Sequence, residues 1–442
     1  MKKLKPITQK KQKSPSRKKS NLFSSDSFWK FGFLSSLGIS LISILIVFHL
    51  KAFSIFDTFL FARDDGWCDK KTEGLFEHCF GDFHQGVSPN FASDPFQMTN
   101  DVMVLSVADK IIWKFGNLFY SWIGPKLTLY LFLLLYLTAI LVGWYKLKKI
   151  QKYNSWFFLF GITSFPSILA ISRMNNVCLV FPIFVLYLEA VQSKNEKKQI
   201  ALLTLCCLFK PQLGALAVLD FINRKYRLLL KKIISIALTI FGSIMMFYNF
   251  EVVRIFKYIS SISNYSNSTE QVSYFYPANV SIGNIFMVLY DLLGYRVSES
   301  KIQIVVSIIV IAVLISCFLY PASENSRRNM YPVFFLAVFG LSGVVQPYYL
   351  LLLNPIILLT LFEDENLKSR NFLRLNFFVA NSFLLIPLLK NWEIAFHGYR
   401  FDSYNQLVIY NLVPICTTLV YALMAIQIHS QNINQRIFHH VK

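Results

Sequence analysis

The stretch "ALLTLCCLFKPQLGALAVLDFINRKYRLLLKK", residues 201–232, decides how the chain is built. Its apolar part, residues 199–222, is about as long as one bilayer-spanning helix. The segments on either side, "SKNEKK" and "NRKYRLLLKK", are both basic, and basic loops stay on the cytoplasmic side of a membrane. A single helix cannot have both ends on one side. We therefore expect a broken hairpin of two half-spans that meet at "FKPQLG", where Pro211 removes a backbone donor and Gly214 loosens the turn.

Similar apolar runs recur along the whole chain after residue 30. With 55% hydrophobic residues, 15% charged residues and 43 Phe, too few polar residues remain to cover a soluble protein. The first run, "FGFLSSLGISLISILIVFHL" at 31–50, has no cleavage site after it, so we interpret it as a retained signal-anchor. The expected fold is an all-α polytopic membrane protein with about 11 to 13 transmembrane helices and short amphipathic helices in its external loops.

The charged residues predict which segments of the chain lie on each side of the membrane. We expect a basic cytoplasmic tail at 1–28, a single transmembrane domain at 29–430 and a cytoplasmic tail at 431–442, with external segments at about 53–125 and 250–300. The first tail could also be a nucleic-acid-binding arm, but the positive-inside rule explains it without any nucleic acid. Anionic membrane lipids would neutralise most of the net charge of +20.

The first external segment contains the polar stretch "FARDDGWCDKKTEGLFEHCFGDFHQGVSPNFASDPF", residues 61–96. Its "GDF" places Asp82 between two phenylalanines and after a small glycine, which suits a general base that a ligand must approach. The alternative interpretation is that Asp82 is simply solvated or pairs with Arg63. Asp64 and Asp65 are competing carboxylates, and one of them could orient a substrate.

The same stretch contains a pair of cysteines, Cys68 and Cys79, outside the apolar runs. In an oxidising compartment they are expected to form a disulfide that ties the loop of Asp82. A zinc site that also uses His78 and His84 is the alternative, but the spacing fits no common zinc pattern.

Two further motifs place polar residues at the same side of the membrane. "SRMNN" either forms a structural turn or uses Arg173, Asn175 and Asn176 to bind an anionic group such as a phosphate. In "FKPQLG", Lys210 and Gln212 fall at the tip of the expected hairpin, where a phosphate would neutralise the lysine. Snorkelling of Lys210 is the alternative.

Two other stretches combine amides with aromatic residues. They are "YFYPANVSIGN" at 274–284 and "SGVVQPYYLLLLNP" at 342–355, the second with Gln346 and Tyr348 at an expected outer turn. Such residues are common at sugar-binding surfaces and equally common at membrane interfaces.

In this order, the signal-anchor, "GDF", "SRMNN", "FKPQLGALAVLDFINRKYR", "NVSIGN" and "QPYYLLLLNP" resemble the GT-C glycosyltransferases of the bacterial envelope. That group includes polyprenyl-phosphate-mannose-dependent α-mannosyltransferases and related arabinofuranosyltransferases. The resemblance implies a GT-C-like bundle and a catalytic role for the aspartate of the "DF" motif. The positions that match the family's motifs are Asp82, Arg173, Asn175, Lys210, Pro211, Asn279 and Ser281.

The sequence departs from this family at one point. Members carry a histidine at the turn before the "LLLLNP"-like helix, whereas this chain has Gln346, Tyr348 and Tyr349 there. His84 is the nearest candidate to replace that histidine.

The resemblance implies transfer of a mannose, another hexose or a pentose from a polyprenyl-phosphate donor to the hydroxyl of a glycolipid or glycan acceptor. The reaction would occur on the extracytoplasmic face of the plasma membrane and invert the anomeric carbon. No cofactor and no divalent metal is expected, since no paired Asp-x-Asp motif falls at the outer end of a span. The alternatives are an O-antigen ligase or polymerase and a flippase or transporter for lipid-linked sugars, for which internal repeats would be typical.

Overall fold

A computed structural model describes residues 27–35, 37–38, 83, 107–247, 253, 281–293, 295, 298–319, 330–340, 345, 347–363, 377–378, 381, 418–430 and 433. These residues form helices and turns and no strand, as predicted. The elements are α4 (Val107–Ile123), α5 (Pro125–Gln151), α6 (Ser155–Ile162), α7 (Phe165–Arg173), α8 (Val177–Gln192), α9 (Glu196–Phe209), η4 (Pro211–Ala217), α10 (Val218–Ile222), α11 (Tyr226–Phe247), α13 (Ile282–Leu292), α14 (Glu299–Leu319), α15 (Met330–Phe335), η6 (Leu336–Gly340), η7 (Pro347–Tyr349) and α16 (Leu350–Glu363).

Three of these helices are long and apolar enough to cross a membrane. They are Pro125–Gln151, Tyr226–Met246 and Lys301–Leu319. Each carries large apolar side chains that are exposed in the structure and would face lipid. The protein is therefore a helical membrane protein. The full number of passes stays a prediction, because several of the other apolar runs lie partly outside the described residues.

Four helices end in the same kind of tight turn. Lys152, Met174, Lys194 and Arg224 adopt the left-handed conformation, with φ between 50° and 58°. In each case the following amide donates to the carbonyl oxygen five residues earlier, at 2.7 to 3.0 Å, which satisfies a helix-end carbonyl. Glycine is usual here, but in three of the turns a basic residue is used, and its charge complements the helix dipole.

The contacts among α5, α8 and α9 give the helices their directions. Tyr136 contacts Asn176, and the Trp144 and Phe181 rings lie 5.2 Å apart, so α5 and α8 run parallel. The short turn after α8 makes α9 antiparallel to it. Asn176 and Lys210 therefore lie at one end of this bundle, which we name the Lys210 end. The opposite end, at the turn around Asn195, is the Asn195 end.

The structure confirms the broken hairpin. Glu196 pairs with Lys231, Gln199 bonds to Lys232, and Thr204 bonds to Ser235, so α9 and α11 run parallel. The chain between two parallel helices must return, and η4 and α10 form this returning limb. One detail of the prediction was wrong. Residues 226–232 of the supposed basic loop are the first turns of α11, because the left-handed turn at Arg224 starts that helix early.

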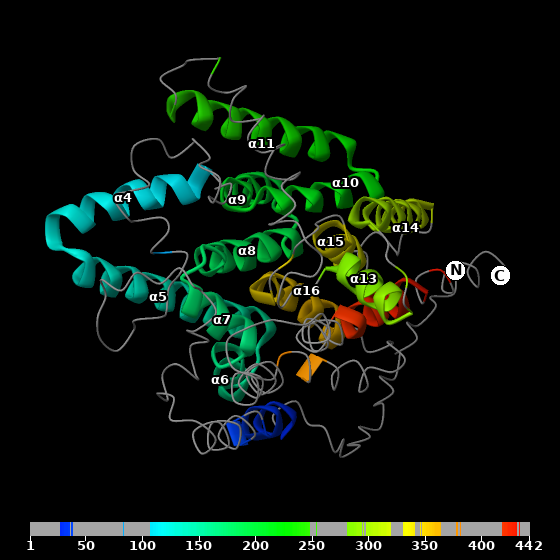
Figure 1. Ribbon diagram of the computed structural model, residues 1–442, viewed down its shortest axis with the longest axis horizontal. Coiled ribbons are helices and arrows are strands. Elements are labelled where there is room, and N and C mark those ends of the chain that lie inside the picture. Colours follow the sequence, from blue (N-terminus) through cyan, green and yellow to red (C-terminus); the bar gives the residue numbers. More distant parts are fainter. Residues whose placement is uncertain are drawn as a thin grey trace, which may run out of the picture.

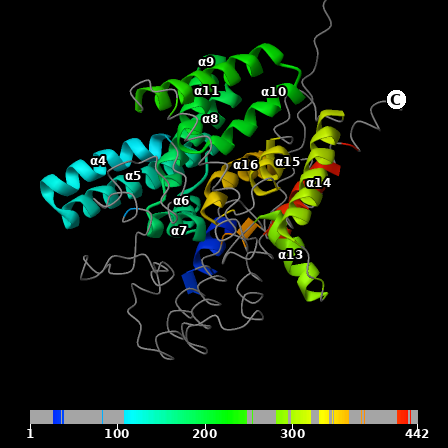
Figure 2. The same cartoon turned by 45° about the horizontal axis from the view of Figure 1, so that its top comes forward.

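The arrangement of the remaining helices is visible in Figures 1 and 2. In both views α15 and α16 lie in the middle, with α8 on one side and α13 and α14 on the other. Helices α4 and α5 meet at a tip that projects beyond the other labelled helices at the left of Figure 1, and in that view they diverge from it. An amphipathic helix of the kind predicted for the external loops is present as α4, and Ile111, Phe115, Leu118 and Trp122 form an exposed apolar stripe along it.

A buried ring of hydrogen bonds links α16 to the C-terminal helix Thr418–Ser430. Asn354 Nδ2 donates to Asn381 Oδ1 at 2.5 Å, Asn381 Nδ2 donates to the Tyr421 hydroxyl at 2.8 Å, and that hydroxyl donates to Asn354 Oδ1 at 2.9 Å. Within an apolar bundle such interhelical hydrogen bonds hold helices together.

Candidate functional site

Lys210 interrupts the helical backbone at the Lys210 end. It is extended (φ −136°, ψ 88°), because the residue before a proline is disfavoured in the α conformation and Pro211 offers no N–H to continue α9. Its ammonium lies 5.7 Å from the centre of the Tyr349 ring, within cation–π range. Two motifs that are 139 residues apart in the chain, "FKPQLG" and "QPYY", are therefore in contact. Gln212 is exposed just beyond the break.

The turn η7 also packs against α7, the helix that ends at Arg173. The Tyr348 and Tyr349 rings stack with centres 5.3 Å apart, and Tyr348 is buried. Thus η7 lies between the helix of Arg173 and the side chain of Lys210. Three of the predicted motifs share one end of the bundle, and two of them contribute a cation to it.

The two asparagines of "SRMNN" are buried and have structural hydrogen bonds. Asn175 Oδ1 accepts from the Val177 amide at 3.0 Å at the start of α8, and the Tyr136 hydroxyl donates to Asn176 Oδ1. These bonds fix the turn that follows Arg173, which is half-buried. The amides of the motif therefore have a structural role at this turn, and anion binding by Arg173, Asn175 and Asn176 stays a prediction.

One residue connects the first external segment to this end. Phe83, only 2% exposed, packs its ring 5.3 Å from that of Phe132 on α5. Phe132 stacks in turn on Tyr136, the residue that holds Asn176. Phe83 directly follows Asp82 in the sequence. Eight predicted site residues lie outside the described part of the chain: Asp64, Asp65, Cys68, Cys79, Asp82, His84, Asn279 and Gln346.

Ser281 begins α13. Its side chain is buried, and its hydroxyl accepts from the Asn284 amide at 3.3 Å, as an N-cap residue does. Helix α13 packs against the π-helical turn η6, which also contacts η4 beyond Lys210. The described part of the "NVSIGN" motif, residues 281–284, is therefore connected to the returning limb through η6.

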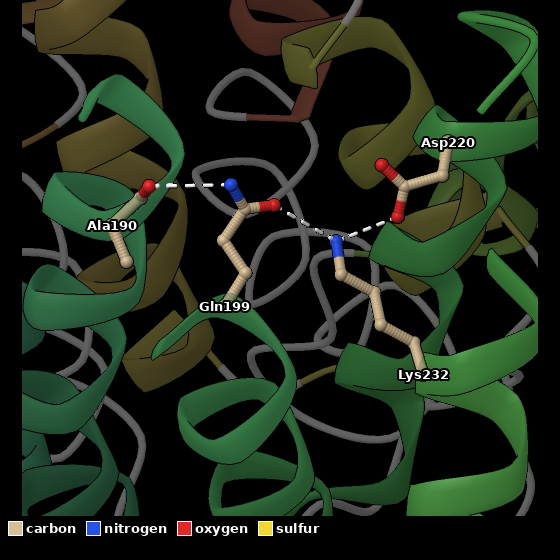
Figure 3. A network of polar contacts seen from close by, with 4 residues as sticks. All are labelled: Ala190, Gln199, Asp220 and Lys232. Carbon is tan, nitrogen blue, oxygen red and sulfur yellow. Dashed lines mark hydrogen bonds and ion pairs between the residues drawn. The ribbon is translucent and has the colours of Figure 1, made fainter. Parts of the chain in front are cut away.

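A second polar group, at the Asn195 end, was not anticipated from the sequence. Lys232 Nζ lies 2.6 Å from Asp220 Oδ2 and donates to Gln199 Oε1 at 3.3 Å (Figure 3). The same ammonium lies 5.5 Å from the Tyr187 ring centre. Gln199 Nε2 donates to the Ala190 carbonyl oxygen at 3.2 Å. The available signal was Asp220 itself, an acid within the apolar run 211–222.

The described part of the chain holds no group of three or more His, Cys, Asp or Glu side chains that could bind a metal ion. Four of the cysteines are buried in the hydrophobic core: Cys178, Cys206, Cys207 and Cys317. The sequence matches no known protein-family model, no curated protein and no solved structure.

Proposed function

We propose that the protein is a membrane-embedded glycosyltransferase that moves one sugar from a polyprenyl-phosphate donor to an acceptor hydroxyl. The observation that carries this proposal is the meeting of α7, Lys210 and η7 at one end of the bundle. The ordered motif resemblance to GT-C enzymes supports it independently. The finer expectations belong to the same proposal: about 11 to 13 passes, a GT-C-like bundle, cytoplasmic termini and a Lys210 end that faces away from the cytoplasm.

Arg173 and Lys210 would hold the donor phosphate. A guanidinium binds two phosphate oxygens with a planar pair of donors, and an ammonium adds a compact positive charge. The Lys210 ammonium already lies over the Tyr349 ring, so that ring would hold it in place before the donor arrives. Apolar helices around this end would receive the polyprenyl chain.

Asp82 would act as the general base. Its carboxylate takes the proton of the acceptor hydroxyl while the hydroxyl oxygen bonds to the anomeric carbon. The bond from that carbon to the phosphate oxygen breaks, and polyprenyl phosphate leaves with the electron pair, neutralised by the two cations. In-line attack inverts the anomeric carbon. Phe83, the next residue in the chain, is anchored through Phe132 and Tyr136, which supports a base near this end.

Other polar residues would orient the sugars and the acceptor. Asp64, Asp65 and His84 are the candidates from the first segment, and Gln212 is the exposed amide beside Lys210. Asn279, Ser281, Gln346 and Tyr348 would contribute from the "NVSIGN" and "QPYY" segments. The disulfide between Cys68 and Cys79 would restrain the loop of the base. The proposal needs no metal or resident cofactor.

The test is transfer by purified protein in lipid, with radiolabelled polyprenyl-phosphate sugars and extracted envelope glycolipids as acceptors. Asp82→Asn keeps the shape of the side chain but cannot take a proton, so transfer is expected to fall by about 100-fold or more. Asp64→Asn and Asp65→Asn are the matched variants, and each should lose much less transfer than Asp82→Asn, because an amide can still orient a substrate by hydrogen bonds. Wild-type transfer by Asp82→Asn would remove the assignment of the base. Mass spectrometry of envelope glycans from a deletion strain would identify the sugar and the acceptor.

A further inference from the structure

The ion pair between Asp220 and Lys232 requires an explanation, because both side chains are almost completely buried. Lys232 is 1% exposed and Asp220 is 6% exposed. Taking two charges out of water is costly, and an apolar pair of similar size is often as stable or more stable. The pair is therefore not explained by stability alone. What it offers instead is a specific position for the two segments that it joins.

The geometry of the pair shows which segments these are. Lys232 on α11 contacts Asp220 on α10 and Gln199 on α9, and its ammonium faces Tyr187 on α8. Gln199 extends the network to the backbone of Ala190 (Figure 3). The Lys232 ammonium of α11 thus lies against residues of three further helices, α8, α9 and α10. The carboxylate is the only one of its partners that lies on the returning limb.

The returning limb connects this end to Lys210. Asp220 and Lys210 are ten residues apart, joined by the 3₁₀ segment η4 and the start of α10. At about 2.0 Å per residue in a 3₁₀-helix and 1.5 Å in an α-helix, the limb from η4 through α10 is roughly 20 Å long. Such a short segment has no slack. A shift of Asp220 along α11 would therefore shift Lys210 relative to Tyr349.

We propose that Asp220 and Lys232 are positioning residues, which hold the returning limb in register and thereby place the Lys210 ammonium over the Tyr349 ring. The inference depends on the proposed function only in the role of Lys210 as a phosphate ligand. The positioning itself concerns the fold and can be measured without a substrate.

The experiment measures the position of residue 210 directly. Cysteines are introduced by Lys210→Cys and Tyr349→Cys in the full-length protein in lipid, and a short bifunctional thiol reagent links them. The yield of linked peptides is determined by mass spectrometry, and Lys210→Cys alone controls for linkage to native cysteines. The yield is compared among four backgrounds: the pair intact, Lys232→Met, the double variant Asp220→Leu with Lys232→Met, and the control Lys231→Met.

The double variant leaves no unpaired charge, so it should fold, and gel filtration selects its folded fraction. Its linked yield is expected to fall about threefold or more, because the effective concentration of the two thiols falls as they separate. Lys232→Met should lose at least as much. The matched control is Lys231→Met, whose lysine side chain is 62% exposed and pairs with Glu196 only at 3.9 Å. It should link as well as the parent.

A folded double variant that links as well as the parent would overturn the positioning role. The positioning role would also be overturned if Lys231→Met lost as much linkage as the double variant. The Asp220 and Lys232 variants are also made with native Lys210 and Tyr349 and assayed for sugar transfer. If linkage falls but these variants keep an unchanged KM for the donor, the positioning role stands and the phosphate role of Lys210 fails. The two hypotheses are thereby tested separately.

Discussion

Gly143 in the middle of α5 is where the packing of the bundle can be tested most sharply. A methyl group added there would lie 2.3 Å from Cδ1 and 2.5 Å from Cε1 of the Phe181 ring on α8. The Phe181 side chain cannot easily change its rotamer, because it is fully buried and its ring packs 5.2 Å from the Trp144 ring. Small residues at such positions let membrane helices approach closely. Gly143→Ala is therefore expected to push α5 and α8 apart.

The size of the effect follows from these distances. Ordinary contact begins at 3.4 Å, so the Phe181 ring must move by at least about 1.1 Å from 2.3 Å. Overpacking of a filled core costs about 1–3 kcal/mol. Replacing glycine by alanine inside a helix gains about 1 kcal/mol, which hides part of that cost. Gly143 lies two turns after Tyr136 on the same face of α5, so the separation also strains the bond from Tyr136 to Asn176.

The matched control is Gly242→Ala in α11, where an added methyl group meets nothing within 4 Å. Because both variants gain the same helix propensity, their difference isolates the clash and should be about 1–3 kcal/mol. The assay is thermal unfolding of the purified protein, followed by the loss of the monodisperse gel-filtration peak. The reasoning is refuted if Gly143→Ala unfolds at the same temperature as Gly242→Ala or at a higher one.

Two further substitutions test the hydrogen bonds that hold the bundle. Tyr136→Phe removes the hydroxyl that donates a hydrogen bond to the turn after Arg173, so it should lower stability by about 0.6 to 1.7 kcal/mol and raise the KM for the polyprenyl-phosphate sugar. The control is Tyr145→Phe at an exposed position of the same helix, which should change neither the melting temperature nor that KM. Asn354→Leu takes one partner from the buried amide of Asn381 and should lower stability by about 1–3 kcal/mol in the same melting assay; an unchanged melting temperature would show that the ring is not a structural link.

The broken hairpin was predictable because local signals and global signals agreed. Pro211 removes a donor and biases Lys210 away from the helix, and basic segments on both sides require the chain to return. Both signals act over a few residues, so they can be recognised without the fold. The start of α11 was misplaced because no such local signal exists there. The sequence near Arg224 contains no glycine, so it does not indicate a left-handed residue.

The buried polar contacts were less predictable. The sequence marks Asp220 as unusual in an apolar run, but it does not say that the partner is Lys232 rather than an adjacent basic residue. Lys231 and Lys232 are neighbours with the same chemistry, yet one is exposed and the other is fully enclosed. Which of them turns inward depends on the rotation of α11 against α9, and only the packing of the two helices determines that.

The two ends of the bundle hold their cations in different surroundings, and under the proposed function this difference separates residues that hold the fold from residues that bind the polyprenyl-phosphate donor. At the Asn195 end, the Lys232 ammonium has a carboxylate, an amide oxygen and an aromatic ring around it, all from the protein. At the Lys210 end, the backbone leaves the helix and the cation lies over an aromatic ring, an arrangement to which an anionic ligand can be added. Substitutions at the first end should therefore be detected first in the position and stability of the hairpin. Substitutions at the second should be detected first in donor binding. A variant of Lys210 that unfolds the protein, or a variant of Lys232 that alters only donor binding, would contradict this division.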